Sequence, residues 1–176
     1  MPEAAGETKE GVVSQSMEKV QHKEGKYLTF GLGSEEYGLE ILKVKEIIGI
    51  MNITYVPKTP KYVKGVINLR GKVIPVIDLR LKFGMDVMEY NDRTCIIVVD
   101  IAGQDGKKTI MGIVVDSVSE VLNIKGEEIE DTPTFGVRLD TDYILGMAKV
   151  KGGVKILLDI DKVLTTDVVM AESMVH

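Results

Sequence analysis

The stretch Lys64–Phe83, which reads KGVINLRGKVIPVIDLRLKF, decides the fold class of this chain. Two short runs rich in Val and Ile meet around the turn residues Arg70-Gly71-Lys72. Short apolar runs divided by a turn are typical of a β-hairpin. The segment LRLKF (79–83) then predicts a single helical turn, and Asp78 stands where its side chain can cap that turn.

This stretch has a divergent second copy, which is the strongest organisational signal in the sequence. LGMAKVKGGVKILLDIDKVL (145–164) aligns with it without gaps, and upstream YGLEILKVKEII (37–48) aligns with MGIVVDSVSEVL (111–122). The alignments pair glycine and charged positions: Gly38 with Gly112, Glu46 with Glu120, Gly65 with Gly146, Arg70 with Lys151, and Asp78 with Asp159. The offset between the copies grows between the two blocks, so the second copy carries loop insertions.

Further apolar runs of the same length are separated by turn residues. Asp105-Gly106 lies between CIIVVDI and TIMGIVVD, and Lys151-Gly152-Gly153 lies between two later runs, so both positions predict hairpins. Each copy then holds about five short strands, and DKVL (161–164) predicts a second helical turn. A five-stranded antiparallel sheet of this size avoids exposed edges by closing into a barrel. We therefore predict an all-β fold of two five-stranded antiparallel barrels packed side by side, with short helical turns.

The predicted boundaries follow from the repeat. Residues 1–25 are polar and aperiodic, which is typical of a flexible leader. Residues 26–86 are expected to form the first barrel and residues 92–165 the second, with residues 166–176 as a C-terminal tail that could include a short helix. The sequence leaves open whether strands or the tail exchange between the two barrels.

Composition restricts the class of protein further. The chain has 176 residues, of which 44% are apolar, 5% are aromatic and none is Trp, so the core is expected to be aliphatic. A formal charge of −5 argues against a general nucleic-acid binder, which needs a basic surface. The single Cys95 excludes an intramolecular disulfide, and no stretch approaches the roughly 20 apolar residues of a membrane helix. These features predict a cytoplasmic protein that does not insert into a membrane.

Residues that could support catalysis or hold a cofactor are scarce. His22 falls in the leader and His176 is the last residue, which weakens histidine-based catalysis and the common zinc sites. Cys95 opens an apolar strand and is interpreted as a buried hydrophobe. The strand-end aspartates could pair as catalytic carboxylates, although capping and turn roles are commoner; they are Asp78, Asp100, Asp116 and Asp159. The sequence therefore predicts no catalytic residue, no metal ligand and no cofactor.

Charge is distributed unevenly along the chain. Between Lys58 and Lys82 seven basic residues stand against Asp78 alone, a net +6 in a chain of −5. Such a segment could form a docking face for an acidic partner or only a solvated rim. The repeat also preserves an acid and a base at the positions of Glu46 and Arg70. We therefore expect an ion pair in each barrel, and we favour a structural role for it over a binding role.

Three segments together resemble the CheW family of chemotaxis coupling proteins: EYGLEILKVKEI (36–47), VPKTPKYVKGVINLRGKVIPVIDLRLKF (56–83) and GIVVDSVSEVL (112–122). The resemblance extends from about Lys26 to Leu164. It leaves no room for the kinase core or receiver domain that accompanies such domains elsewhere, so a stand-alone coupling protein is the best match. The family implies two SH3-like barrels, in agreement with the repeat.

The resemblance also implies a function. It implies a non-enzymatic scaffold that couples the cytoplasmic tip of methyl-accepting chemoreceptors to the regulatory domain of the histidine kinase CheA, at receptor arrays next to the inner membrane. In this picture a groove between the barrels grips the receptor, and barrel ends contact the kinase. The matching motif positions are expected to serve coupling: Val44, Glu46, Gly65, Asn68 and Arg70. For Gly65 the alternative is a requirement for close backbone packing.

Two other classes of function are compatible with the sequence. A double β-barrel that binds a small molecule or a nucleic acid is motivated by the basic segment between residues 58 and 82, although few stacking aromatics accompany the charges. A hydrolytic or metal-dependent enzyme would depend only on the strand-end aspartates.

Overall fold

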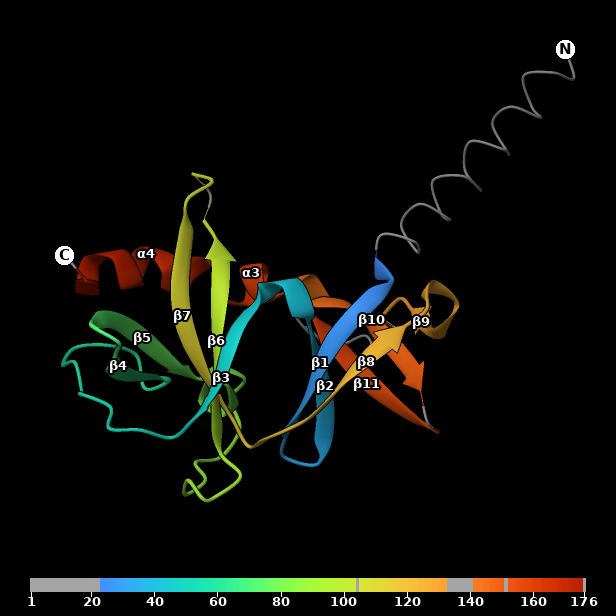
Figure 1. The fold of residues 1–176 in the computed structure, drawn as a ribbon, viewed down its shortest axis with the longest axis horizontal. Coiled ribbons are helices and arrows are strands. Elements are labelled where there is room, and N and C mark those ends of the chain that lie inside the picture. Colours follow the sequence, from blue (N-terminus) through green and yellow to red (C-terminus); the bar gives the residue numbers. More distant parts are fainter. Residues whose placement is uncertain (1–22, 104, 133–140, 151, 176) are drawn as a thin grey trace, which may run out of the picture.

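The computed structural model describes residues 23–103, 105–132, 141–150 and 152–175, which form two β-sheets (Figure 1). The predicted flexible leader lies almost wholly outside the described residues. In Figure 1 one sheet forms the lobe on the left, which we call sheet B, and the other forms the lobe on the right, which we call sheet A.

Sheet B contains five strands in the order β3-β6-β7-β5-β4. These are β3 (Val44–Gly49), β4 (Val63–Leu69), β5 (Lys72–Asp78), β6 (Cys95–Ala102) and β7 (Lys108–Val115). Sheet A has the order β8-β1-β2-β11-β10-β9. Its strands are β1 (Gly25–Leu32), β2 (Glu35–Glu40), β8 (Ser117–Ile124), β9 (Ile129–Glu130), β10 (Ile144–Val150) and β11 (Gly153–Leu158).

Each sheet joins the first two strands of one sequence copy to the later strands of the other copy. β1 and β2 belong to the first copy but lie in sheet A, whereas β6 and β7 belong to the second copy but lie in sheet B. The junctions are parallel pairs, β2 with β11 and β5 with β7. Their registers match, because Gly38 stands opposite Leu157 and Gly112 stands opposite Val76. The two copies are therefore interlocked rather than placed one after the other.

The predicted all-β fold with two barrel-like units is confirmed, as are the hairpins β4–β5, β6–β7 and β10–β11. Two details differ: the described part of sheet A has six strands, and each sheet contains a parallel pair. The parallel pairs arise because the last strand of one copy meets the second strand of the other while running in the same direction. Residues 26–86 and residues 92–165 each supply strands to both sheets.

Buried apolar side chains of the described residues form three clusters. The largest draws on both sheets and holds them together, with Leu28 and Phe30 from β1 packed in the same cluster as Ile97 and Val99 from β6. A second cluster lies within sheet B and a third within sheet A. Aliphatic side chains dominate all three, as the composition predicts.

Short helices end both copies. α2 (Leu79–Lys82) begins at Asp78 and α3 (Ile160–Val163) begins at Asp159, and each aspartate accepts a hydrogen bond from a backbone amide of its helix at 3.3 Å. Three 3-10 turns complete the connections: η1 (Ile41–Lys43), η2 (Gly126–Glu128) and η3 (Thr141–Tyr143). The predicted caps are therefore confirmed.

The C-terminal tail forms helix α4 (Thr165–Val175), which packs beside β5 of sheet B (Figure 1). Val168 enters the cluster shared by the two sheets. Asp167, which is 1% exposed, accepts a hydrogen bond from the Tyr62 hydroxyl at 2.8 Å and pairs with Lys82 Nζ at 2.9 Å. Lys82 Nζ also lies 4.4 Å from the centre of the Tyr62 ring. These contacts fasten the tail to the first sequence copy.

Candidate protein-binding site

The hairpin between β4 and β5 turns at Arg70 and Gly71, whose φ angles are 51° and 87°. Two successive residues with positive φ are the pattern of a type I′ turn, whose twist matches that of the flanking strands. Asn68 supports this turn because its Oδ1 accepts a hydrogen bond from the Gly71 amide at 2.8 Å. The turn therefore fixes the direction in which the Arg70 side chain leaves the sheet.

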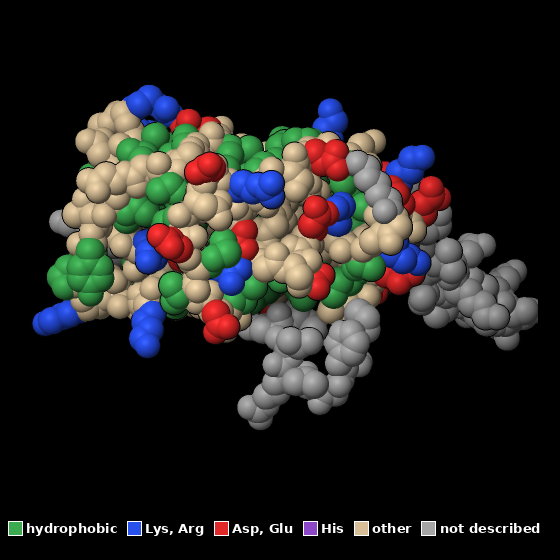
Figure 2. All heavy atoms as spheres, turned by 90° about the horizontal axis from the view of Figure 1, so that it is seen from below, with side chains coloured by type: hydrophobic (Ala, Val, Ile, Leu, Met, Phe, Trp, Pro, Cys, Tyr) green, Lys and Arg blue, Asp and Glu red, His purple; other side chains and the backbone are tan. Residues whose placement is uncertain are grey.

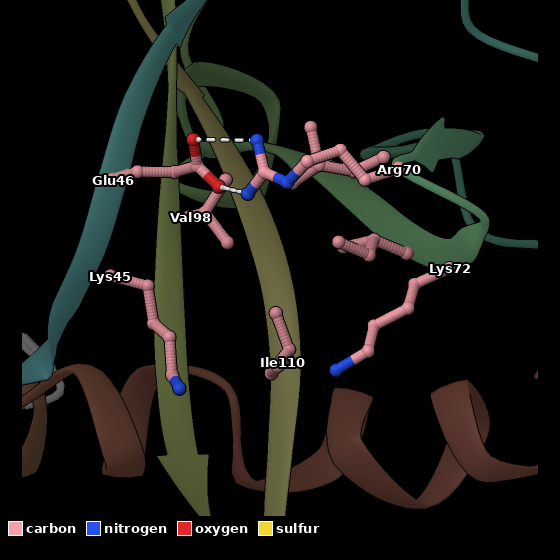
Figure 3. A pocket seen from close by; sticks show the side chains of 8 residues that line it. Lys45, Glu46, Arg70, Lys72, Val98 and Ile110 are labelled. Atoms are coloured by element: carbon pink, nitrogen blue, oxygen red, sulfur yellow. Dashed lines mark hydrogen bonds and ion pairs between the residues drawn. The ribbon is translucent and has the colours of Figure 1, made fainter.

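Arg70 reaches from this turn to Glu46 on β3 (Figure 3). Its Nη1 donates to Glu46 Oε2 at 3.4 Å, and its Nη2 donates to Oε1. The hydrogen bonds and the charge of Glu46 raise the pKa of Arg70. The Arg70 side chain is 72% exposed, so solvent screens the pair. The ion pair predicted for the first copy is confirmed, whereas the predicted second pair involves Lys151, which lies outside the described residues.

Val44 and Glu46 belong to one strand but face opposite sides of sheet B. The pairing of β3 with β6 shifts between them, since Val44 stands opposite Val99 and Glu46 opposite Val98. Val98 and Val99 are successive residues of β6 and therefore point to opposite faces, so the residues of β3 paired with them do so too. Val44 accordingly packs against the cluster shared by both sheets, whereas Glu46 points toward Arg70. The structure therefore brings Glu46, Arg70 and the turn together and places Val44 on another face.

Gly65 is enclosed by backbone. Its φ is 137°, and a Cβ atom there would stand 1.9 Å from the carbonyl oxygen of Thr54. Thr54 and Val66 exchange backbone hydrogen bonds of 2.8 and 2.9 Å at the same place. This geometry supports a packing role for Gly65, because any side chain would separate the two backbones.

A cavity of about 320 Å³ opens beside the Glu46–Arg70 pair (Figure 3). It is lined by Lys45, Glu46, Leu69, Arg70, Lys72, Ile74, Val98 and Ile110. Its floor is aliphatic and its rim is charged. We call this feature the barrel B cavity.

A larger cavity of about 570 Å³ lies where the two sheets meet. Its lining is mostly apolar and comes from sheet A, the segments next to its strands and the α2 region that follows sheet B: Tyr37, Lys82, Phe83, Met85, Thr132, Tyr143, Ile144, Met147, Ile156 and Leu158. Most of these side chains also pack against the shared cluster. The seam between the sheets is therefore a second concave, apolar surface.

Three of the four strand-end aspartates, Asp78, Asp116 and Asp159, have structural partners. Besides capping α2, Asp78 accepts a hydrogen bond from the Tyr90 hydroxyl at 2.7 Å, and burial together with this hydrogen bond raises the pKa of Tyr90. Asp116 pairs with Arg80 at 2.7 Å and also accepts a hydrogen bond from the Gly33 amide at 2.7 Å. In the described residues no group of three or more His, Cys, Asp or Glu side chains is placed to hold a metal ion.

Three of the seven basic residues between Lys58 and Lys82 are engaged in ion pairs. Arg70, Arg80 and Lys82 are paired with Glu46, Asp116 and Asp167, respectively. On the face seen in Figure 2, side chains of both signs alternate with apolar ones. Sequence reasoning missed Asp167 as a partner of Lys82, because 85 residues separate the two in the chain.

None of the helices in the described part of the chain has the length and apolar character needed to cross a membrane.

The fold and these surfaces define an all-β, two-barrel protein-interaction module, and comparison with known proteins gives its family. The CheW-like domain model matches residues 26–168, so the chain belongs to the CheW family. It is 43% identical over 141 residues to the chemotaxis protein CheW of Klebsiella aerogenes, covering 80% of this chain and 82% of that protein. It is 32% identical over 140 residues to CheW of Rhizobium meliloti, covering 80% and 87%.

A solved structure supports the same assignment. The scaffolding protein TtCheW from Thermoanaerobacter tengcongensis matches with a TM-score of 0.71 and 37% identity, covering 80% of this chain and 92% of that one. As a member of this family, the chain is a chemotaxis scaffold and not an enzyme.

Proposed function

We propose that this chain couples chemoreceptors to the chemotaxis histidine kinase CheA, by binding the cytoplasmic tip of the receptor and the regulatory domain of the kinase. The protein would then act in the cytoplasm, at receptor arrays next to the inner membrane. The observation that carries this proposal is the family match over residues 26–168, which spans the described strands of both sheets except Gly25, the first residue of β1.

The two concave surfaces support a scaffold that holds two partners. Val44 lies at the edge of the cluster shared by both sheets, on the side of β3 that packs against that cluster. Glu46, Asn68 and Arg70 lie at the β4–β5 turn, on a different face. Binding energy in such modules comes mainly from desolvated apolar anchors, while charges set register and partner choice. We assign Val44 to receptor contact and the turn residues to coupling, with Gly65 supporting the turn strand.

A reconstitution tests the proposal. The purified chain is mixed with a receptor cytoplasmic fragment and the kinase, and co-sedimentation and kinase autophosphorylation are measured with and without the chain. We expect a ternary complex and kinase activity that depends on the receptor only when the chain is present. Binding to neither partner would remove the proposed function while leaving the fold and family unchanged.

Val44→Glu tests the proposed receptor contact on β3. It places a charge on the apolar side of β3, so we expect receptor binding to fall by tenfold or more while kinase binding is retained. Equal loss of both interactions would show that Val44 acts through the fold instead of through receptor contact.

A further inference from the structure

In sheet A, polar side chains fill the position that corresponds to the barrel B cavity. The sequence copies align Ile74 with Lys155, and the matching registers of the parallel pairs align Ile110 with Glu36. In sheet A, Lys155 and Glu36 form an ion pair, and the Ser119 hydroxyl donates a hydrogen bond to Glu36 at 3.4 Å. The Lys155 side chain is 11% exposed, so these polar groups occupy the place.

In sheet B two isoleucines replace this ion pair and leave a cavity. Ile74 and Val98 belong to the buried cluster of sheet B, and Leu69 and Ile110 pack against it. The cavity floor is therefore continuous with a close-packed aliphatic core. An apolar floor of this kind favours an apolar group that would otherwise be in water, by about 0.8 kcal/mol for each buried methylene.

The rim of the cavity carries cations. Figure 3 shows Lys45 and Lys72 on either side of Ile110, opposite the Glu46–Arg70 pair. Neither lysine has an ion-pair partner in the described part of the chain, whereas Arg70 is engaged by Glu46. The second sequence copy has Ser119 in place of Lys45 and Gly153 in place of Lys72. The free positive charges are thus specific to this barrel.

We infer that the barrel B cavity binds an acidic segment of a partner protein, which inserts one aliphatic side chain between flanking carboxylates. The volume of about 320 Å³ suits a side chain and its neighbours. Because the chain as a whole carries −5, the two lysines supply the local complementarity that an acidic partner requires. The cavity opens on the face of β3 that carries Glu46, away from the face with Val44, which packs against the shared cluster. The inference deepens the proposed function, because Glu46 and Arg70 line this cavity and are assigned to coupling, and it adds the chemistry of the segment that binds there.

A differential peptide selection tests this inference on the full chain. A random peptide library displayed on phage is first passed over the double variant Ile74→Lys, Ile110→Glu, and the peptides that bind it are discarded. This variant carries in sheet B the lysine and glutamate that fill the corresponding position in sheet A. The remaining peptides are selected on the unaltered chain. Amide spectra establish that the variant is folded, and those of the unaltered chain map where the selected peptides bind.

We expect peptides with one aliphatic residue flanked by Asp or Glu, which perturb the amides of Lys45, Leu69 and Ile110. Charge reversal by Lys45→Glu with Lys72→Glu, both at exposed positions, should lower affinity by tenfold or more. Raising salt should also weaken binding.

Three outcomes would overturn the inference. They are a selection without enriched peptides, enrichment of peptides that lack acidic residues, and binding that maps to the seam or survives the charge reversal. Should the clearing variant fail to fold, the charge-reversal pair replaces it in the clearing step. The proposed coupling function can fail in its own reconstitution without affecting this result.

Discussion

The two barrels repeat one plan but treat the same interior position differently. In sheet A the facing positions on the parallel strands hold Lys155 and Glu36, and in sheet B they hold Ile74 and Ile110. An ion pair with a nearby hydroxyl fills the first, whereas the second is left open. The duplicated backbone therefore tolerates both solutions. What differs is the side-chain volume and polarity that each copy places there, which makes one barrel closed and the other available to a partner.

The largest expected effect comes from comparing the matched glycines Gly65 and Gly146. A Cβ at Gly65 would meet the Thr54 carbonyl oxygen at 1.9 Å, whereas one at Gly146 would meet the flexible Ile129 side chain at 2.7 Å and the Glu130 carbonyl oxygen at 2.9 Å. We expect Gly65→Ala to lower the free energy of unfolding by at least about 3 kcal/mol and Gly146→Ala by about 2 kcal/mol. Urea denaturation measures both. Equal losses would show that the close approach in sheet B is not tighter than its counterpart.

The next effect concerns α4, which packs against sheet B. The side chains of Lys82 and Asp167 are 11% and 1% exposed. Burial acts to lower the pKa of Lys82, but the hydrogen bond and charge of Asp167 outweigh it and raise that pKa. Lys82→Met leaves Asp167 buried without its cation, so we expect a loss of about 3 kcal/mol. Lys149→Met, at an exposed ion pair in sheet A, is the matched control and should change stability by less than about 1 kcal/mol.

A third test converts one barrel interior into the other. Glu36→Ile alone leaves Lys155 buried without a partner and should cost about 2 kcal/mol. Adding Lys155→Ile recreates the isoleucine pair of sheet B and should recover most of that loss. Calorimetric unfolding of both variants measures the effect. If the double variant is less stable than the single one, the surroundings in sheet A must require charge at this position.

An effect of similar size is expected at alkaline pH. Burial, followed by the charge of Glu40, raises the pKa of Tyr27 from 10.0 to about 12. A group with a raised folded pKa contributes its full stability below its unfolded pKa and loses that contribution as pH rises through the folded value. The free energy of unfolding should therefore fall by about 2 kcal/mol between pH 10 and 12. Tyr27→Phe removes the titrating group from sheet A and should make this fall shallower. An unchanged slope would assign the effect to other groups.

The smallest stability effect is expected at Arg70. Its side chain is largely exposed and its ion pair is screened, so Arg70→Ala should leave the thermal unfolding midpoint unchanged. Partner binding should fall if Arg70 serves coupling. A lowered unfolding midpoint with unchanged partner binding would instead support the structural role that the sequence favours for the Glu46–Arg70 ion pair.

Much of the fold could be predicted from local signals. The Val- and Ile-rich runs predicted the strands, Arg70-Gly71 predicted a hairpin, and Asp78 and Asp159 predicted the helix caps. Such features depend on residues close together in the chain, so composition and spacing are sufficient. Part of the site could also be predicted from the sequence. The repeat preserves an acid at the position of Glu46 and a base at the position of Arg70, and this pattern predicted their ion pair.

The sequence by itself therefore determined the strands, their turns and the duplication, since hydrophobic periodicity and turn chemistry act over a few residues. Only the tertiary structure decided that β1 and β2 join strands of the second copy instead of β4 and β5 of their own copy. Either arrangement would satisfy the backbone hydrogen bonds of these strands. The tertiary structure likewise decided the contact of Lys82 with Asp167 and the cavity between Ile74 and Ile110. Long-range packing sets which side chains face one another, and no local pattern in the chain encodes that choice.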